Sequence, residues 1–227
     1  VTYTNNDYGK GLADVYAASA KAHGIEVTAV TAHEDGKADY SAEVATLASA
    51  GGDAVAVIGY LDQGGKGIIQ GSLDSGAFDT FILSDGMIGD SLTDAFGKDL
   101  NKSFGSLPGS TGKGAGIFAK VAKAGGIDSS GPYTGESYDA AALIVLAMQA
   151  SGSADRKGIA DNVMAVANGP GKKIYPGELK KALDLLAKGK AINYEGATGV
   201  IFTDVGEAEG SFLEKEIKGG KFKTKKQ

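Results

Sequence analysis

Three side chains that could recognise a small charged ligand each follow a short apolar segment of the chain, namely Tyr8, Tyr60 and Asp85. A carboxylate such as that of Asp85 accepts charge-assisted hydrogen bonds from an ammonium group. A tyrosine ring offers its face to the same positive charge. Two phenol rings and one carboxylate around a cleft would therefore suit a small cation with some apolar body.

The positions of these residues favour a binding site, because open parallel sheets bind ligands beyond the carboxyl ends of their strands. Each residue also has a plainer structural explanation. Asn5, Asn6 and Asp7 form a polar turn ahead of a helix, which is an ordinary N-cap sequence, with Tyr8 then covering the edge of the sheet. Asp85 could likewise cap a helix. Both interpretations stay open at the level of spacing.

Two glycine-containing segments are similar to nucleotide-phosphate loops but lack residues that those loops require. The dinucleotide fingerprint needs a third glycine three residues after its second, and here Gly9 and Gly11 are followed by Asp14 at that place. A Walker loop needs serine or threonine after its lysine, and here Lys113 is followed by Gly114. We therefore expect no phosphate cradle at either place.

Other catalytic chemistries find few suitable residues in this chain. It has no cysteine, and therefore no disulfide, thiol nucleophile or thiolate metal site. Its two histidines are His23, expected where a helix end exposes carbonyl groups, and His33, expected to be exposed in a polar loop. An α/β enzyme would need a nucleophile-base pair, a metal cluster or a cofactor loop. We predict no catalytic residues, no metal and no cofactor.

Charge and hydropathy restrict the partners. The net charge is −5, and positive charge gathers only in the tail 218–227, so a broad nucleic-acid-binding face is not expected. The apolar runs are shorter than the roughly 18 residues of a membrane helix. We predict a protein that binds no nucleic acid and does not itself span a membrane.

The elements that must position these residues alternate regularly in the first hundred residues. Four β-α units predict a parallel sheet covered on both faces, with right-handed crossovers. The predicted strands are 1–4, 25–31, 53–60 and 80–85, and the helices after them are 9–22, 40–50, 63–75 and 88–96.

The second half of the chain has a different pattern. A glycine- and serine-rich segment, 102–116, is followed by helices with hardly a strand among them, and 199–222 predicts a pair of hairpins. The helix over 134–151 is apolar nearly all round, which predicts burial against a sheet that this half does not supply. Together with the short first strand, this suggests that an N-terminal part of the fold is absent. The predicted helices are 115–124, 134–151, 155–167 and 177–188.

Four segments together resemble the branched-chain amino acid binding proteins of bacterial ABC transporters, which have the type I periplasmic binding protein fold. They are "NNDYGKGLA", "DAVAVIGYLDQGGKGIIQGSLDSGAFDTFILSDGM", "SYDAAALIVLAMQASG" and "YEGATGVIFTDVGE". The match runs from Val1 to Phe222. The last segment is similar to the family pattern Y-x-G-x-x-G-x-x-x-F-D-x-x-G-D, with Thr203 ahead of Asp204 and Glu207 near the usual final aspartate.

The resemblance implies a role for each candidate residue. Tyr8 and Tyr60 would line an amino acid cleft, and Asp85 would take the α-ammonium group of the ligand, where many relatives have glutamate. The shorter side chain would shift the ammonium group slightly or admit a water. Leucine, isoleucine and valine are common ligands in the family, but relatives also take polar amino acids, amides, urea or aromatic acids.

The resemblance also implies two doubly wound parallel-sheet lobes joined by three crossovers, with the first lobe incomplete here. Residues 1–108 and 212–227 would form the second lobe, and 109–211 part of the first. The implied function is capture of an amino acid between the lobes and delivery to a permease in the inner membrane. The protein would be periplasmic, or an extracellular lipoprotein in a Gram-positive organism. The alternative is a sensory domain of the same fold, responding to an amide or amino acid.

Overall fold

The computed structural model describes residues 1–225 and divides the chain into two compact units. Unit 1 comprises Val1–Leu107 together with the chain from Leu213 onward, and unit 2 comprises Pro108–Phe212. The chain therefore leaves unit 1 once and returns to it once. The assignment of these units to the second and first lobes of a two-lobed fold stays a prediction.

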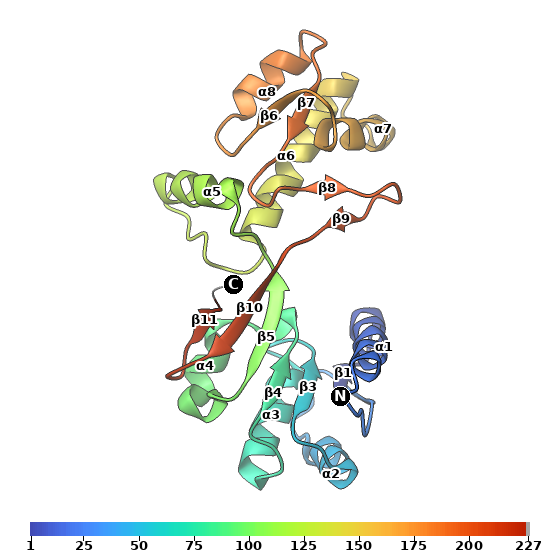
Figure 1. Ribbon diagram of the computed structural model, residues 1–227, viewed down its shortest axis with the longest axis vertical. Coiled ribbons are helices and arrows are strands. Elements are labelled where there is room, and N and C mark those ends of the chain that lie inside the picture. The colour runs from blue at the N-terminus through green and yellow to red at the C-terminus, as the bar shows by residue number, and fades with distance from the viewer. Residues whose placement is uncertain (226–227) are drawn as a thin grey trace. The chain divides into compact units, whose positions relative to one another are not determined.

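Within the described residues, the sheet of unit 1 has seven strands. They are β1 (Thr2–Thr4), β2 (Thr31–His33), β3 (Val55–Ile58), β4 (Phe81–Leu83), β5 (Phe104–Pro108), β10 (Phe212–Ile217) and β11 (Phe222–Thr224). Their order is β11-β10-β5-β4-β3-β1-β2, and β3, β4, β5 and β10 can be followed side by side in Figure 1. The strands β2, β1, β3, β4 and β5 pair in parallel, while β10 and β11 pair antiparallel. The predicted parallel α/β fold is confirmed.

One face of this sheet carries the main hydrophobic core of unit 1. The helices that contribute to it are α2 (Ser41–Ala50), α3 (Gly64–Ser75) and α4 (Asp90–Phe96), and their buried side chains pack against β3, β4 and β5. Right-handed crossovers place α1 (Asp7–Ala22) on the opposite face. All four residues of β3 are buried, as a central parallel strand requires. Short 3₁₀ segments, η1 (Asp85–Met87) and η2 (Gly97–Leu100), flank α4.

The strand predicted over 25–31 is wrong in its position. The observed strand β2 starts at Thr31, and the register places Thr31 opposite Thr2 of β1. Residues 25–30 therefore lie beyond the first residue of β1 in this chain and have no strand beside them for a ladder. Ile25 is correspondingly 58% exposed.

The glycine- and serine-rich segment 102–116 contains a strand that the sequence did not predict. Residues Phe104–Pro108 form β5, in which exposed and buried positions alternate. Gly105 lies opposite Leu83 of β4, where a Cβ atom would come within 2.2 Å of the Leu83 carbonyl oxygen. Gly105 therefore marks close packing between two strands, although the composition of the segment 102–116 resembles that of a linker.

Unit 2 contains four helices and two small sheets among its described residues. Strands β6 and β7 pair in parallel and β8 and β9 pair antiparallel. Both hairpins predicted over 199–222 are confirmed, since β10 and β11 form the other one. The parallel pair β6–β7 was missed because each strand is short and contains polar side chains, Lys172 and Lys173 in β6 and Asn193 in β7, so that neither shows an apolar run. The elements are α5 (Lys113–Ala124), α6 (Thr134–Ser151), α7 (Arg156–Ala167), β6 (Lys172–Ile174), α8 (Leu179–Leu186), β7 (Ile192–Tyr194), β8 (Ile201–Phe202) and β9 (Ala208–Glu209).

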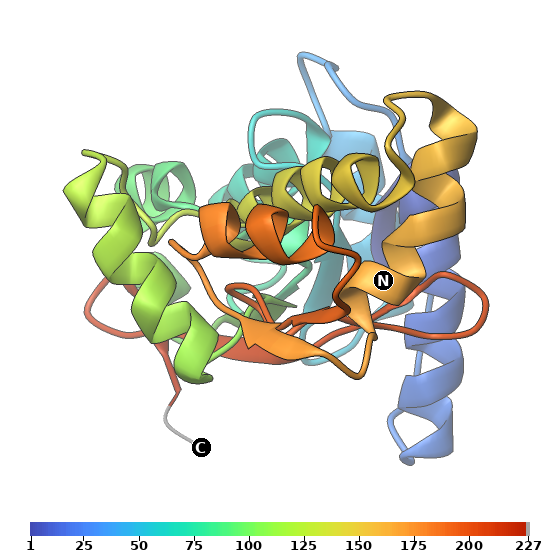
Figure 2. The ribbon, with the colours of Figure 1, turned by 90° about the horizontal axis from the view of Figure 1, so that it is seen from above.

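The apolar helix α6 is buried on one side only. Leu143 and Leu146 lie in a core shared with α7, α8 and β7, and Figure 2 shows α7 and α8 packed against α6. Ile144 and Val145 are 47% and 45% exposed on the other side. The sequence predicts burial of this helix against a sheet that this half of the chain does not supply. In the structure the sheet beside it has two short strands, and the other side of the helix is exposed.

Unit 2 is held together at the start of α6 by a buried carboxylate. Asp139 accepts hydrogen bonds from the Tyr194 hydroxyl at 2.9 Å, the Ala197 amide at 2.7 Å and both the amide and hydroxyl of Thr198. Burial and the Asp139 charge raise the pKa of Tyr194 far above its ordinary value. Two of the segments that carry the family resemblance thus meet at one side chain.

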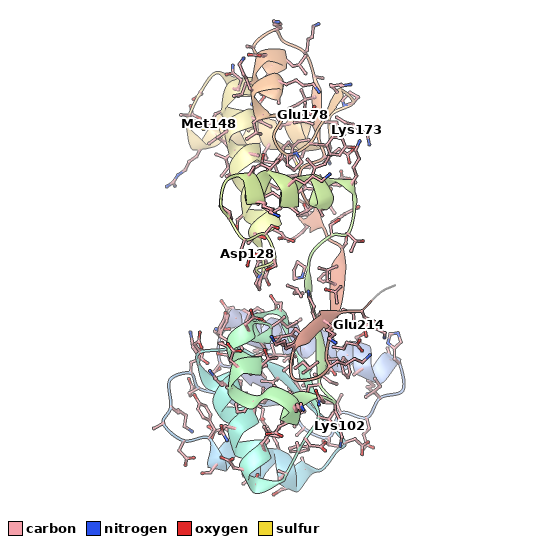
Figure 3. The ribbon with its side chains drawn as sticks, turned by 90° about the vertical axis from the view of Figure 1, so that its left-hand side faces the viewer. Lys102, Asp128, Met148, Lys173, Glu178 and Glu214 are labelled. Carbon is pink, nitrogen blue, oxygen red and sulfur yellow. The ribbon has the colours of Figure 1, made fainter. Side chains whose placement is uncertain are left out.

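Charged side chains pair mainly at the surface of each unit. Lys102 pairs with Asp79 in unit 1, and Lys173 pairs with Glu195 in unit 2; Lys102 and Lys173 are labelled in Figure 3. Such exposed pairs contribute little to stability.

Among the helices of residues 1–225, none is both long enough and apolar enough to cross a membrane.

Candidate functional site

The three candidate residues lie at one edge of the unit 1 sheet. Tyr8 follows β1, Tyr60 follows β3 and Asp85 follows β4, and these strands are parallel. Their carboxyl ends therefore share an edge. The order of strands reverses between β1 and β3, so Tyr8 and Tyr60 flank the switch point at which open α/β sheets bind ligands.

The first turn of α1 positions Tyr8. Asn6 is the N-cap, and its side-chain oxygen accepts a hydrogen bond from the Gly9 amide at 2.8 Å. Gly9 packs so closely on the end of β1 that a Cβ atom would lie 2.0 Å from the Thr4 carbonyl oxygen. The helix therefore begins immediately after the strand, and Tyr8 lies at the sheet edge.

Tyr8 contacts each of the other two side chains directly. The Tyr8 hydroxyl donates to Asp85 Oδ1 at 2.7 Å, and it also lies 3.1 Å from Ser84 Oγ. The rings of Tyr8 and Tyr60 stack with their centroids 5.3 Å apart and an angle of 30° between their planes. The structure thus brings together all three residues that spacing predicted.

The environment of the site keeps the Tyr8 phenol protonated. Burial raises the pKa of Tyr8 far above its ordinary value, and the neighbouring Asp85 carboxylate raises it further. The neutral phenol donates a hydrogen bond to the Asp85 carboxylate and keeps its own proton. The site therefore combines one negative charge with two half-buried aromatic rings, a set of groups that suits an ammonium ligand.

Ser84 is a residue of the site that sequence reasoning missed. Its hydroxyl oxygen accepts a hydrogen bond from the Gly59 amide at 3.3 Å and lies 3.1 Å from the Tyr8 hydroxyl oxygen. The Leu61 amide donates to the Gly86 carbonyl oxygen at 3.1 Å, which joins the same two loops. Ser84 immediately precedes Asp85, and that adjacency is the signal that could have identified it.

The prediction for His23 agrees with the structure, and the prediction for His33 does not. His23 caps α1, with Nδ1 2.8 Å from the Ser19 carbonyl oxygen, as predicted. His33 was expected to be exposed, and that expectation is wrong, because it is 1% exposed at the end of β2. Its Nδ1 lies 2.9 Å from Thr2 Oγ1, and its buried Nε2 has no hydrogen-bond partner among residues 1–225. The charged residues after His33 suggested a loop, but β2 extends through it.

A metal centre finds no support in the part of the chain that the structure describes. Across residues 1–225, no group of three or more histidine, cysteine, aspartate or glutamate side chains is placed to hold a metal ion.

An open parallel sheet with aromatic and acidic groups at its carboxyl edge defines a fold built to bind small molecules. The chain belongs to the periplasmic binding protein family, whose model matches residues 1–203. A curated relative is a chemotactic signal transduction system substrate-binding protein of Halobacterium salinarum. It is 43% identical over 68 residues, which is 30% of this chain and 16% of that protein.

Solved structures agree on the fold. A leucine binding protein from Thermotoga maritima aligns with a TM-score of 0.73 and 18% identity over 99% of this chain and 59% of its own. A branched-chain amino acid transporter substrate binding protein from Streptococcus pneumoniae, solved in complex with isoleucine, aligns with a TM-score of 0.69 and 19% identity over 97% of this chain and 57% of its own. The type I periplasmic binding fold is confirmed, and this chain spans less than two thirds of the length of these proteins.

Proposed function

We propose that the protein is the solute-binding component of an ABC importer and captures an amino acid, branched-chain or related, at the Tyr8–Tyr60–Asp85 site. The ligand is bound and released unchanged, so the protein is not an enzyme. Closure around the ligand presents a form that docks on a membrane permease. The site of action is periplasmic, or the outer surface of a Gram-positive cell.

The observation that carries the proposal is that Tyr8 joins the group, because it is hydrogen-bonded to Asp85 and stacked on Tyr60. Asp85 supplies the negative charge for an α-ammonium group, and the stacked rings of Tyr8 and Tyr60 supply faces for the same charge and for an aliphatic body. Membership of a solute-binding family and a leucine-binding structural neighbour support the same ligand class.

The test replaces Asp85 in the full-length protein. Asp85→Asn keeps the size of the side chain but removes its charge, which leaves a bound ammonium group without its counter-ion. We expect the affinity for L-leucine, measured by isothermal titration calorimetry, to fall by about 2–5 kcal/mol. That loss is roughly 30-fold to several thousand-fold in Kd.

Asp62→Asn is the matched control, because Asp62 is an exposed carboxylate only two residues after Tyr60. It removes the same charge from the same edge of the unit and should leave Kd within about twofold. An unchanged Kd in Asp85→Asn would contradict the ammonium role. The affinities of the wild-type protein for isoleucine, valine and glutamine would define the range of ligands.

A second function is favoured by one comparison. The relative from Halobacterium salinarum is a substrate-binding protein of a chemotactic signalling system, so the same fold here could report a ligand to a transducer. Deletion of the gene separates the two roles. Loss of radiolabelled leucine uptake with normal chemotaxis supports the importer, and loss of the chemotactic response with normal uptake supports the sensor.

A further inference from the structure

Asp35 follows β2 and connects the two loops that carry the tyrosines. Its Oδ2 accepts a hydrogen bond from the Thr4 hydroxyl at 2.5 Å, and its Oδ1 accepts one from the Gly64 amide at 3.1 Å. Thr4 ends β1, four residues before Tyr8, and Gly64 begins α3, four residues after Tyr60. One carboxylate therefore spans the switch point of the sheet.

Both hydrogen bonds to this carboxylate are strengthened by burial of their donors and by the charge of the acceptor. Thr4 is 1% exposed and Gly64 is buried, while Asp35 is half-buried. Hydrogen bonds to a charged acceptor are roughly twice as strong as neutral ones. The ring of His33 packs beside Gly64, so that a Cβ atom there would come within 2.5 Å of it. The start of α3 is thus fixed by contact as well as by hydrogen bonding.

We propose that Asp35 is a positioning residue of the ligand site. By tying the end of β1 to the start of α3, it sets the separation of the two loops at which Tyr8 and Tyr60 stack 5.3 Å apart. It acts through Thr4 and Gly64 and not on the ligand itself. The inference rests on the proposed function for its importance to binding, but the positioning can be measured without any ligand.

The neighbouring carboxylate of Glu34 provides a matched control. Glu34 Oε1 accepts a hydrogen bond from the Asn5 side chain at 2.6 Å at the exposed surface, and among the described contacts none joins it to α3. Glu34→Gln removes one negative charge from the same loop and keeps the side-chain size. If Asp35→Asn affects the tyrosines more than Glu34→Gln does, the loss of one negative charge from the loop cannot explain the difference.

The experiment uses the full-length protein labelled with ¹³C at the tyrosine ζ carbons and follows each phenol by NMR. In Asp35→Asn we expect the Tyr8 and Tyr60 resonances to move and the pKa of Tyr8, which burial raises, to fall toward its ordinary value. We expect Glu34→Gln to leave both resonances in place. The affinity for L-leucine should fall about tenfold or more in Asp35→Asn and stay unchanged in Glu34→Gln.

Thr4→Val is a second variant that keeps the test sharp if Asp35→Asn fails to fold. It removes only the hydroxyl arm, so the Tyr8 resonance should move while the Asp35–Gly64 contact persists. The effects of Thr4→Val and Asp35→Asn on the Tyr8 resonance should be less than additive in the double variant.

Two results would overturn the proposal: unchanged Tyr8 and Tyr60 resonances in folded Asp35→Asn and Thr4→Val, or equal shifts in Glu34→Gln. A wild-type protein that binds no amino acid would instead overturn the proposed function. The ligand-free spectra would then still decide whether Asp35 positions the tyrosines.

Discussion

At the scale of the residue, the stacked pair of tyrosines and the adjacent carboxylate are the groups that we propose for ligand recognition. All three could be predicted from the sequence because each directly follows a strand, and parallel strands bring their carboxyl ends to one edge. Ser84 and Asp35 also follow strands, β4 and β2, so their place at this edge could be predicted, but their contacts could not. Their roles depend on which backbone amide or hydroxyl each loop presents, and residue type alone does not specify a loop path.

The buried imidazole of His33 leads to a prediction about pH. Burial lowers the pKa of His33, and the nearby carboxylates of Asp35, Glu43 and Glu34 offset this only in part. Below about pH 6.5, the unfolded chain takes up a proton that the folded chain does not. We expect the free energy of unfolding to fall between pH 6.5 and 5.5, by at most about 1.4 kcal/mol per pH unit from this group.

Urea denaturation at several pH values checks this expectation. In His33→Gln the slope of unfolding free energy against pH should decrease over that window, whatever the absolute stability of the variant. His23→Gln is the matched substitution at an exposed histidine and is measured in parallel. An identical slope in His33→Gln would show that other groups cause the acid sensitivity.

At the scale of the element, the two glycines of the first turn of α1 have different roles. A Cβ atom at Gly9 would lie 2.0 Å from the Thr4 carbonyl oxygen, whereas one at Gly11 would meet nothing within 4 Å. We expect Gly11→Ala to stabilise the protein by up to about 1 kcal/mol through helix propensity. Gly9→Ala should destabilise it by roughly 1–3 kcal/mol, because α1 must move away from β1.

Chemical denaturation of the two variants side by side checks this prediction. Each substitution adds one methyl group to the same helix, so the difference between them isolates the contact with β1. Equal effects would show that Gly9 serves backbone flexibility instead of close packing. The spacing that suggests a phosphate loop is thus explained by the way one helix packs on one strand.

The elements were easiest to predict where several residues agree. The strand β3 is apolar on both faces, and its burial is uniform, so composition alone identified it. The strand β5 was not predicted because Gly105, Pro108 and the serines around them resemble a linker. Its strand character comes from pairing with β4. The position of β2 depends on the register with β1, which no local pattern encodes.

At the scale of the whole molecule, the exposed side of α6 predicts the behaviour of the isolated chain. Ile144 and Val145 are about half exposed, and the chain spans 59% of the Thermotoga maritima structure. Exposed apolar patches on a helix favour association. We expect the 227-residue chain, expressed alone, to aggregate or to pair with a partner fragment.

Size-exclusion chromatography with light scattering measures this association. The double variant Ile144→Lys and Val145→Glu should reduce it, whereas Val205→Lys, at an 84% exposed turn, is expected to change it little. A cleanly monomeric wild-type chain with one cooperative melting transition would contradict the prediction.

The two passages of the chain between its units lie on neighbouring strands, β5 and β10. The Ile217 amide donates to the Ser103 carbonyl oxygen at 3.0 Å, and the Gly109 amide donates to the Ser211 carbonyl oxygen at 3.0 Å, so the passages run antiparallel. Unit 2 is thus, in topology, a large insertion at the tip of a hairpin. A short turn in its place would convert a discontinuous fold into a continuous minimal receptor domain with Tyr8, Tyr60 and Asp85 intact.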